Sequence, residues 1–293
     1  MMTWLSLAML LIAPPSGGPA AAAQVPPPLK VAVSARAIQP GEVVWMEVTS
    51  PEVLDGVTAT VFGRSIPFDA PLDRHAWQAL IGIDLEAAAG DHVVRIEAAR
   101  AGQSHLATTY TLRVAVKQFE TRRLRVAARY VNPPQSEMAR IQREAKRLQA
   151  IFDAVTPRRW DGRFLLPVDD KAISNFGTRS VYNGQPRSPH SGVDFPSPPD
   201  TPVHASNSGR IVLADDLYFT GNTVIVDYGS GLYSLFAHLS KLAVAEGETV
   251  RAGTVVGLVG ATGRVTGPHL HWAVRVRGAR VDPLSLVAAS SHP

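Results

Sequence analysis

Hydrophobic and polar residues alternate in short runs over the first third of the chain. The runs cover residues 30–35, 43–48, 57–62, 77–83, 92–98 and 108–116, and turn-forming residues such as Pro and Gly separate them. Alternation with a period of two is the pattern of a strand with one buried face. The spacing predicts an antiparallel β-sandwich of immunoglobulin type over residues 28–118. We expect this domain to act in spacing or substrate presentation rather than in chemistry.

The period changes after this region. Basic residues are frequent over 122–129, Pro133 and Pro134 follow, and hydrophobic residues then recur every three or four positions from Met138 to Val155. This recurrence predicts an amphipathic helix with one apolar stripe and with Ser136 as its N-cap. Residues 119–158 are therefore interpreted as a basic linker and a helix. We expect the helix to pack on its neighbouring domain, and a regulatory latch over a site is the alternative.

Residues 159–288 form a second predicted domain, rich in β-pattern and punctuated by glycine. Its most informative run is Gly267 to Trp272, which contains His269 and His271. In a strand these two histidines project from one face, whereas Leu270 and Trp272 project from the other. One face is therefore a candidate site and the other belongs to the core. A single His-x-His pattern also fits two polar residues on a solvated strand face.

Two further segments of this domain carry residues that suit chemistry. His190 and Asp194 lie four positions apart with Gly192 between them, and His238 follows an alternating run over residues 232–237. The context of His190 and Asp194 does not predict a helix, so a turn that leads into a strand must bring the pair together. Imidazoles held on rigid backbone suit metal binding or proton transfer.

Composition narrows the class of protein. A chain of 293 residues is long enough for two domains, and 45% hydrophobic with 18% charged residues is typical of globular proteins. The absence of cysteine excludes disulfides and thiolate zinc sites. A net charge of +4 favours anionic partners. The basic residues are scattered, without interleaved aromatic residues, which argues against nucleic acid and fits cell-wall polymers better.

The amino-terminal residues resemble an export signal. Residues 4–13 are apolar over the length of a secretory hydrophobic region, and Ala21 to Ala23 offer small residues for cleavage, so residues 1–23 are interpreted as a signal peptide. No Lys or Arg precedes the apolar block, and an uncleaved anchor is the alternative. No later run approaches the roughly eighteen apolar residues of a membrane span. We expect an exported protein of the periplasm or cell envelope, or one secreted beyond it.

Three motifs of the second domain resemble those of lysostaphin/LytM-type zinc peptidases, which cut bacterial peptidoglycan. The motifs are His190 to Asp194, Ala237 to Leu239 and Gly267 to Trp272, and the resemblance covers about residues 160–287. It implies that His190, Asp194 and His271 hold Zn²⁺ and that His238 and His269 form the catalytic pair.

The ligand types implied by the resemblance agree with zinc chemistry. Three nitrogen and oxygen ligands leave a fourth position open, as in catalytic zinc sites, where the ion lowers the pKa of water to about 7. No His-Glu-x-x-His helix supplies a glutamate base, so an imidazole must accept the proton. The sequence does not separate the roles of His238 and His269.

Some positions depart from the family pattern or stay open. The family commonly has a histidine before glycine where Asp227 and Tyr228 stand, and often a tyrosine at Phe236, which leaves the substrate contacts there in question. By analogy with the family, Asn175 and Arg179 line the cleft. It is an equally good interpretation that Asn175 is a turn residue and that Arg179 is a surface charge. We expect His204, which lies in the same domain, to be solvated.

The expected function is zinc-dependent endopeptidase activity on peptide stems or cross-links of peptidoglycan. The bond between D-Ala and diaminopimelate is the expected target, because no wall-anchoring repeat follows the catalytic domain. One alternative is a catalytically inactive relative that binds and activates other wall hydrolases. Another is a biotinyl or lipoyl carrier, whose hairpins residues 246–257 resemble. A carrier needs a lysine at a hairpin tip, and Lys241 lies outside such a motif. The sequence does not indicate an oligomeric state.

Overall fold

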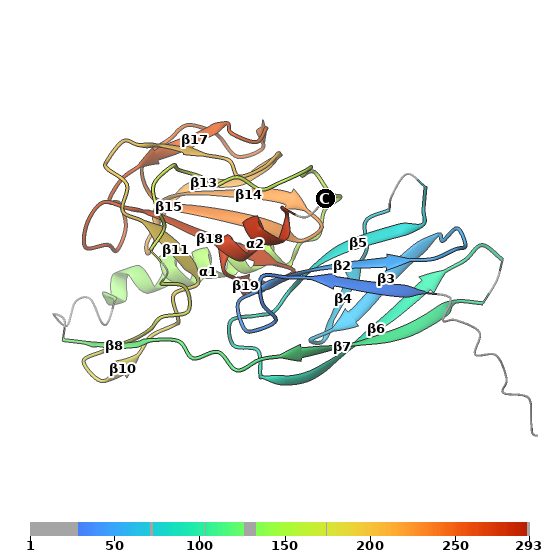
Figure 1. The fold of residues 1–293 in the computed structure, drawn as a ribbon. Coiled ribbons are helices and arrows are strands. Elements are labelled where there is room, and N and C mark those ends of the chain that lie inside the picture. The colour runs from blue at the N-terminus through green and yellow to red at the C-terminus, as the bar shows by residue number, and fades with distance from the viewer. Residues whose placement is uncertain (1–28, 71–72, 103, 126–132, 174, 292–293) are drawn as a thin grey trace, which may run out of the picture.

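The computed structural model describes residues 29–70, 73–102, 104–125, 133–173 and 175–291. Strands dominate it, which confirms the predicted mainly β class. Figure 1 shows two β-rich parts beside each other, the amino-terminal one in blue to green and the carboxyl-terminal one in yellow to red. The predicted signal peptide, residues 1–23, lies outside the described residues.

The amino-terminal part contains two antiparallel sheets around one core. Its strands are β1 (Lys30–Ser34), β2 (Val43–Thr49), β3 (Gly56–Val61), β4 (Arg64–Pro67), β5 (Ala76–Gly82), β6 (Gly90–Ala99) and β7 (Leu106–Val114). One sheet has the order β1-β2-β5 and the other β4-β3-β6-β7. Alternate side chains such as Val44, Met46 and Ile96 are fully buried in the shared core, as the period of two requires. The sequence pattern located every strand except the short β4. The immunoglobulin-like topology and the limits 28–118 stay predictions.

The carboxyl-terminal part is built on a nine-stranded sheet whose main path is β11-β18-β15-β14-β13-β16, with β12, β17 and β19 attached to it. Its elements are β11 (Gly192–Phe195), β12 (Pro202–His204), β13 (Gly209–Leu217), β14 (Gly221–Gly229), β15 (Leu232–Leu242), β16 (Thr249–Val250), β17 (Val255–Val259), β18 (Leu270–Val276), β19 (Ala279–Val281) and α2 (Pro283–Ala289). Phe195, Tyr228, Phe236 and Trp272 fill the core. The limits 159–288 of this domain stay a prediction.

A small third sheet connects the linker to this part. Strand β8 (Thr121–Leu124) pairs in parallel with β9 (Arg179–Tyr182), and β9 forms a hairpin with β10 (Gln185–Pro186). The sequence analysis placed β8 in a basic linker and did not predict this sheet. The last basic residues of that linker, 126–129, lie outside the described residues.

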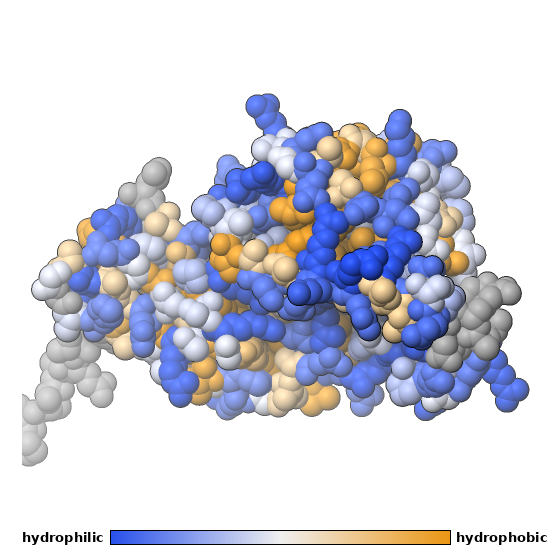
Figure 2. Space-filling model, turned by 180° about the vertical axis from the view of Figure 1, so that it is seen from behind, coloured by the Kyte–Doolittle hydropathy of each residue, from blue (hydrophilic) through white to orange (hydrophobic). Residues whose placement is uncertain are grey.

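The predicted amphipathic helix is present as α1 (Met138–Asp153). Leu148, Ile151 and Phe152 pack on the outer side of the nine-stranded sheet, as expected for a helix that covers its neighbour. The prediction that Ser136 is the N-cap is wrong. Residues 135–137 form a short 3₁₀ turn, η2 (Gln135–Glu137), which displaces the start of the α-helix. Figure 2 shows the molecule from the side of α1, where hydrophilic residues surround smaller hydrophobic areas.

Ion pairs hold α1 in this position. Arg140 donates to the carboxylate of Asp216 at 3.0 Å, and Arg147 donates to the carboxylate of Asp215 at 2.7 Å.

Within the described ranges, no helix combines the length and the apolar character that crossing a bilayer requires.

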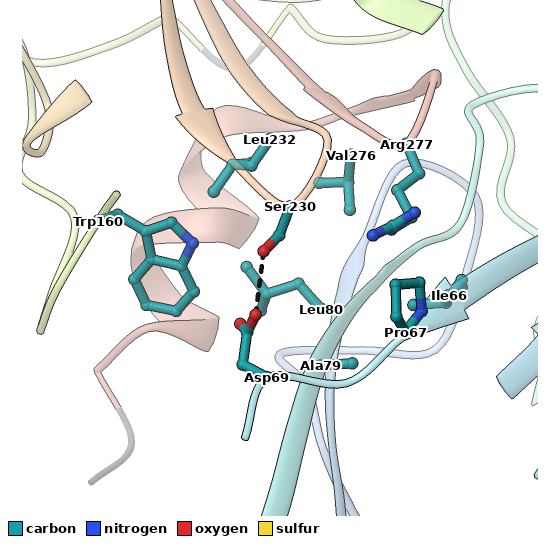
Figure 3. A pocket seen from close by; sticks show the side chains of 10 residues that line it. All are labelled: Ile66, Pro67, Asp69, Ala79, Leu80, Trp160, Ser230, Leu232, Val276 and Arg277. Atoms are coloured by element: carbon teal, nitrogen blue, oxygen red, sulfur yellow. Dashed lines mark hydrogen bonds between the residues drawn. The ribbon is translucent and has the colours of Figure 1, made fainter. Parts of the chain in front are cut away.

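The two β-rich parts share buried contacts. Val43 of β2 belongs to the core cluster of the carboxyl-terminal part, and its amide donates to Ser285 Oγ at 2.7 Å. A Cβ at Gly82 of β5 would lie 2.8 Å from Ala279 Cβ and 2.9 Å from Val276 Cβ, so glycine allows the close approach. Figure 3 shows a small cavity between the parts, where Ser230 Oγ donates to Asp69 at 3.0 Å.

Asp84 links the two parts by polar contacts. It accepts hydrogen bonds from the Arg280 side chain at 2.6 and 3.1 Å and from the Arg280 amide at 2.8 Å. Burial alone would raise the pKa of Asp84, but the hydrogen bonds from Arg280 outweigh burial and hold the pKa below its usual range. This carboxylate therefore contributes stability above its unfolded pKa, and the contribution is lost as the pH falls through its folded pKa.

We expect Asp84→Ala to lower the free energy of unfolding by about 1–3 kcal/mol at neutral pH, because it leaves the amide and Nε of half-buried Arg280 without their acceptor. Asp91→Ala is the matched control, since the ion pair of Asp91 with Arg113 is exposed and should contribute less than about 0.5 kcal/mol. Denaturant unfolding of both variants at pH 7 and pH 3 measures the effect. A similar loss in both variants, or a loss at Asp84 that is no smaller at pH 3 than at pH 7, would contradict the assignment.

Candidate metal centre

Strand β18 is the backbone of the candidate site. It pairs with β11 on one side and with β15 on the other, and His271 lies opposite both Asp194 of β11 and Ala237 of β15. Leu270 and Trp272, which alternate with the histidines, are fully buried in the core. The two-faced strand inferred from residues 269–272 is therefore present. His269 directly precedes β18 and pairs with Gly260.

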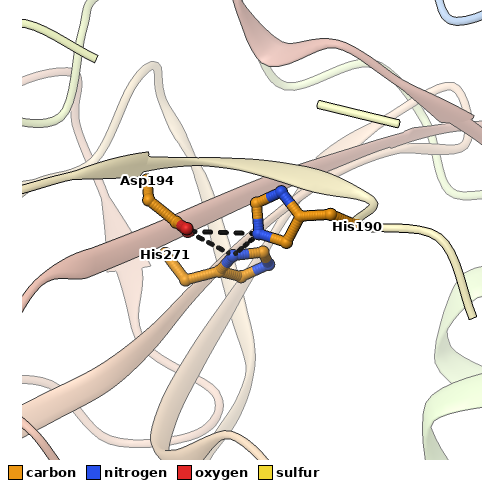
Figure 4. Close-up of side chains that lie close together, drawn as sticks. All are labelled: His190, Asp194 and His271. Carbon is orange, nitrogen blue, oxygen red and sulfur yellow. Dashed lines mark hydrogen bonds and ion pairs between the residues drawn. The ribbon is translucent and has the colours of Figure 1, made fainter. Parts of the chain in front are cut away.

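Three side chains converge on one point in front of β18 and β11, as Figure 4 shows. His190 Nε2 lies 3.0 Å from His271 Nδ1, and His271 Nδ1 lies 2.9 Å from an oxygen of Asp194. The same oxygen lies 3.2 Å from His190 Nε2. His190, which is outside a strand, reaches the group from the turn that leads into β11, as the sequence analysis expected of this pair.

This triangle has the size of one face of a small metal site. Ligand atoms about 2.0–2.1 Å from a tetrahedral zinc ion lie about 3.3–3.4 Å from one another. The observed edges of 2.9–3.2 Å are close to this value. His190, Asp194 and His271 also form a group that could hold a metal ion by the nature of their donor atoms. The residues present therefore fit the metal that the family resemblance implies.

Asn175 supports two of the three candidate ligands. Its side-chain amide donates to Asp194 Oδ2 at 2.7 Å, and its backbone carbonyl accepts from His190 Nδ1 at 3.2 Å. A carbonyl can only accept, so the proton of His190 is on Nδ1 and Nε2 is free to bind a metal. The sequence alone did not decide whether Asn175 lines the cleft or belongs to a turn.

Gly192 is required by the close packing of His271. A Cβ at this position would lie 2.4 Å from the Trp272 carbonyl oxygen and 2.7 Å from His271 Cε1. The imidazole of His271 therefore lies directly against the backbone of β11. Any side chain at position 192 would displace the candidate ligand.

His238 lies beside the candidate ligands at the bulged part of β15. Its ring centroid is 4.9 Å from that of His269 and 6.0 Å from that of His271. Its backbone has a φ of +63°, which is costly for a residue other than glycine and is characteristic of functional sites. Nδ1 donates to the Thr262 carbonyl at 2.9 Å, so Nε2 of the neutral ring is a free base.

His269 has the same tautomer as His238. Its Nδ1 donates to the Gly267 carbonyl at 2.9 Å, and its Nε2 lies 3.9 Å from the Asp194 oxygen shared by the candidate ligands. Gly267 belongs to the entry turn that precedes the strand. Both imidazoles therefore direct Nδ1 to a backbone carbonyl and turn Nε2 toward the three candidate ligand atoms.

Burial and hydrogen bonds set the charge states of the group. Burial alone would raise the pKa of Asp194, but the adjacent imidazoles of His190 and His271 outweigh burial and hold the pKa well below its usual range. Burial is the main cause that lowers the pKa of His271. Burial likewise lowers the pKa of His238 to about 4. At neutral pH Asp194 is therefore ionised and the imidazoles of His271 and His238 are neutral; a carboxylate and a neutral imidazole are the forms that bind metals.

The other positions singled out in the sequence lie away from this group. Phe236 is fully buried and stacks on Trp272 at 6.5 Å, and Asp227 is buried and accepts a hydrogen bond from Thr156 at 2.7 Å. Both side chains are therefore buried inside the carboxyl-terminal part. His204 donates through Nδ1 to the Gly253 carbonyl at 2.9 Å. Arg179 is exposed at the start of β9.

We expect Asn175→Ala to weaken metal affinity about 10- to 100-fold, the usual effect of removing a group that orients a metal ligand. Zinc titration with a competing chelator measures the change. Asn207→Ala is the matched control, because the buried amide of Asn207 donates to the backbone carbonyls of Asp161 and Arg163 instead. An equal loss of affinity in both variants would show general destabilisation rather than ligand positioning.

Comparison with known proteins agrees with this geometry. Residues 188–283 match the model of peptidase family M23. A crystal structure of a Pseudomonas aeruginosa protein assigned to peptidase M23 is 31% identical, superposes with a TM-score of 0.67 and covers 87% of this chain and 97% of its own.

Curated relatives match over part of the chain. Peptidoglycan DD-endopeptidase ShyA of Vibrio cholerae is 41% identical over 132 residues, which cover 43% of this chain and 31% of ShyA. DD-carboxypeptidase/endopeptidase Mpg of Neisseria meningitidis is 45% identical over 97 residues, which cover 33% of this chain and 22% of Mpg. The alignments thus span less than a third of these relatives.

The chain belongs to peptidase family M23. The resemblance to lysostaphin/LytM-type peptidases inferred from the three histidine motifs is confirmed. All five residues named from those motifs lie inside the matched range 188–283, whereas Asn175 lies before it.

Proposed function

We propose that this protein is a zinc-dependent endopeptidase that hydrolyses peptide stems or cross-links of bacterial peptidoglycan. The observation that carries the proposal is the convergence of His190 Nε2, His271 Nδ1 and Asp194 Oδ1 within 3.2 Å of one another. Three nitrogen and oxygen donors with an open fourth position are characteristic of catalytic rather than structural zinc.

In this proposal His190, Asp194 and His271 hold the ion, and the carboxylate supplies the negative charge of the site. When bound, zinc polarises the carbonyl of the scissile peptide bond and makes water acidic enough to react near neutral pH. Asn175 keeps Asp194 and His190 oriented through the contacts described above.

His238 and His269 act as the proton-transfer pair. Each has Nδ1 bonded to a backbone carbonyl, so each ring is fixed in orientation with Nε2 available to accept a proton. One imidazole accepts the proton of the attacking water at Nε2. The other, when protonated at Nε2 by solvent, donates that proton to the oxyanion or to the leaving amine. An imidazole base agrees with the absence of a His-Glu-x-x-His sequence from the chain.

The names of the relatives support peptidoglycan as the substrate. ShyA is a peptidoglycan DD-endopeptidase and Mpg a DD-carboxypeptidase/endopeptidase. For this chain we propose the same polymer, with the bond between D-Ala and diaminopimelate as the target. Action on this polymer places the protein in the periplasm or cell envelope or outside the cell, which agrees with the export signal predicted over residues 1–23.

The purified chain is expected to contain about one zinc ion and to release peptide fragments from isolated sacculi. A chelator should abolish fragment release, and added Zn²⁺ should restore it. Mass spectrometry of the fragments identifies the bond. Full activity of metal-free protein would refute zinc dependence, whereas zinc binding and sacculus binding without hydrolysis would favour the inactive regulator.

A further inference from the structure

The small sheet of β8, β9 and β10 carries a cationic face outside the metal centre. Parallel pairing places Arg123 beside Val181, and the alternation of side chains puts Arg123 and Arg179 on the same face. Arg125 directly follows β8 and lines the same hollow as Arg123. All three are exposed, and within the described part of the chain none of them has an ion-pair partner. The neighbouring Arg122, on the opposite face, is instead paired with Glu120.

The face contains a groove rather than a flat surface. Arg123, Arg125, Val181, Asn183 and Gly184 line an open hollow of about 770 Å³. Asn183 and Gly184 form the turn of the β9–β10 hairpin, with positive φ angles of 51° and 83°. Arginine presents a planar fork of donors that matches a carboxylate with two parallel hydrogen bonds. Arg123 and Arg125, which have no ion-pair partner among the described residues, are therefore suited to an anionic group from outside.

The groove is connected to the metal centre by a short length of strand. The amide of His190 donates to the Thr178 carbonyl at 3.0 Å, so Thr178 marks the end of β9 next to the candidate ligand. Val181, the pairing partner of Arg123, lies three residues beyond Thr178, which is about 10 Å along the strand. An extended peptide of four residues spans about 13 Å. A stem peptide with one bond at the metal centre can therefore extend to the groove. Figure 1 shows β8 and β10 in this small sheet below β11.

We propose that the groove at Arg123 and Arg125 binds a free carboxylate of the peptidoglycan peptide stem beside the bond that is cut. The inference rests on the proposed function, and it adds residues 121–125, which lie outside the region matched by the family model. Stem peptides with glutamate or diaminopimelate residues carry such carboxylates. A lipid surface is the weaker fit, because lipid recognition relies on clusters of about four to eight cations next to membrane-inserting segments.

The test compares Arg123→Ala/Arg125→Ala with the control Arg95→Ala/Arg251→Ala, which removes the same charge from exposed positions away from the groove. Binding of the full chain to isolated sacculi is measured by sedimentation with chelator present, which prevents cleavage. The groove variant is expected to bind about 5- to 30-fold more weakly than the parent, and the control is expected to bind as the parent does. Amidation of the sacculus carboxylates should weaken binding by the parent and abolish the difference in binding between the parent and the groove variant.

Equal binding by the groove variant and the control would overturn the inference. So would a variant that loses binding to phosphatidylglycerol vesicles but keeps binding to sacculi, since the groove would then serve lipid phosphate. Fragment release without chelator is measured separately on the parent. If the parent cuts sacculi but the arginines do not affect binding, the inference alone fails. If binding depends on the arginines but nothing is cut, the proposed function alone fails and the carboxylate site stands.

Discussion

The His271→Ala variant is expected to lose its zinc and its activity together. His271 Nδ1 lies within 3.0 Å of both other candidate ligand atoms, so its removal leaves a two-ligand site that holds zinc poorly. Zinc per chain and the rate of fragment release from sacculi should both fall to background. Metal analysis of the purified variant beside the hydrolysis assay measures the two quantities on one preparation.

His204→Ala is the matched control for this experiment. It removes an imidazole from the same part of the chain, where His204 donates to the Gly253 carbonyl, and it should keep full zinc and activity. Circular dichroism of both variants distinguishes metal loss from unfolding. A folded His271→Ala protein that retains stoichiometric zinc would remove His271 from the ligand set.

Replacement of either histidine proposed for proton transfer has a different expected result. His269→Ala and His238→Ala should each keep zinc, because His190, Asp194 and His271 remain in place. Turnover should fall by about 10²- to 10⁴-fold, the usual contribution of a positioned acid or base. The measurement is zinc per chain beside the single-turnover rate for both variants.

The combined outcomes of these variants test the assignment of roles. Loss of metal from His269→Ala with retention in His271→Ala would mean that the two histidines have been assigned the wrong way round. Retention of both zinc and activity in all of the variants would place the active site elsewhere in the chain.

The parts of the fold that the sequence predicted are those with a local periodic signal. The strands of the amino-terminal part other than β4 appear within one or two residues of their predicted limits, and α1 follows its three- and four-residue repeat. The two faces of β18 followed from residues 269–272 because strand geometry alone determines which side chains share a face. The residue types of the site were likewise visible in its three motifs.

The parts that the sequence did not predict depend on contacts between distant residues. Parallel pairing of β8 with β9 joins residues 121 and 179, and no local period signals such a partner. The contacts of Asn175 with Asp194 and His190 exist only because a turn folds back over β11. Helix α2 is short, but Asp282 caps it and Pro283 occupies its first turn, and these two signals could have located it.

The contact between β2, β5 and the carboxyl-terminal core affects how the chain can be divided for engineering. A peptidase fragment that begins at residue 159 would lack the side chain of Val43, which is fully buried in its core cluster. It would also uncover Ala279 and Val276, which pack against Gly82. Such a fragment would expose an apolar surface and should tend to self-associate. A transplantable catalytic unit would therefore need polar substitutions at these contact positions, or strands β2 and β5 carried along with it.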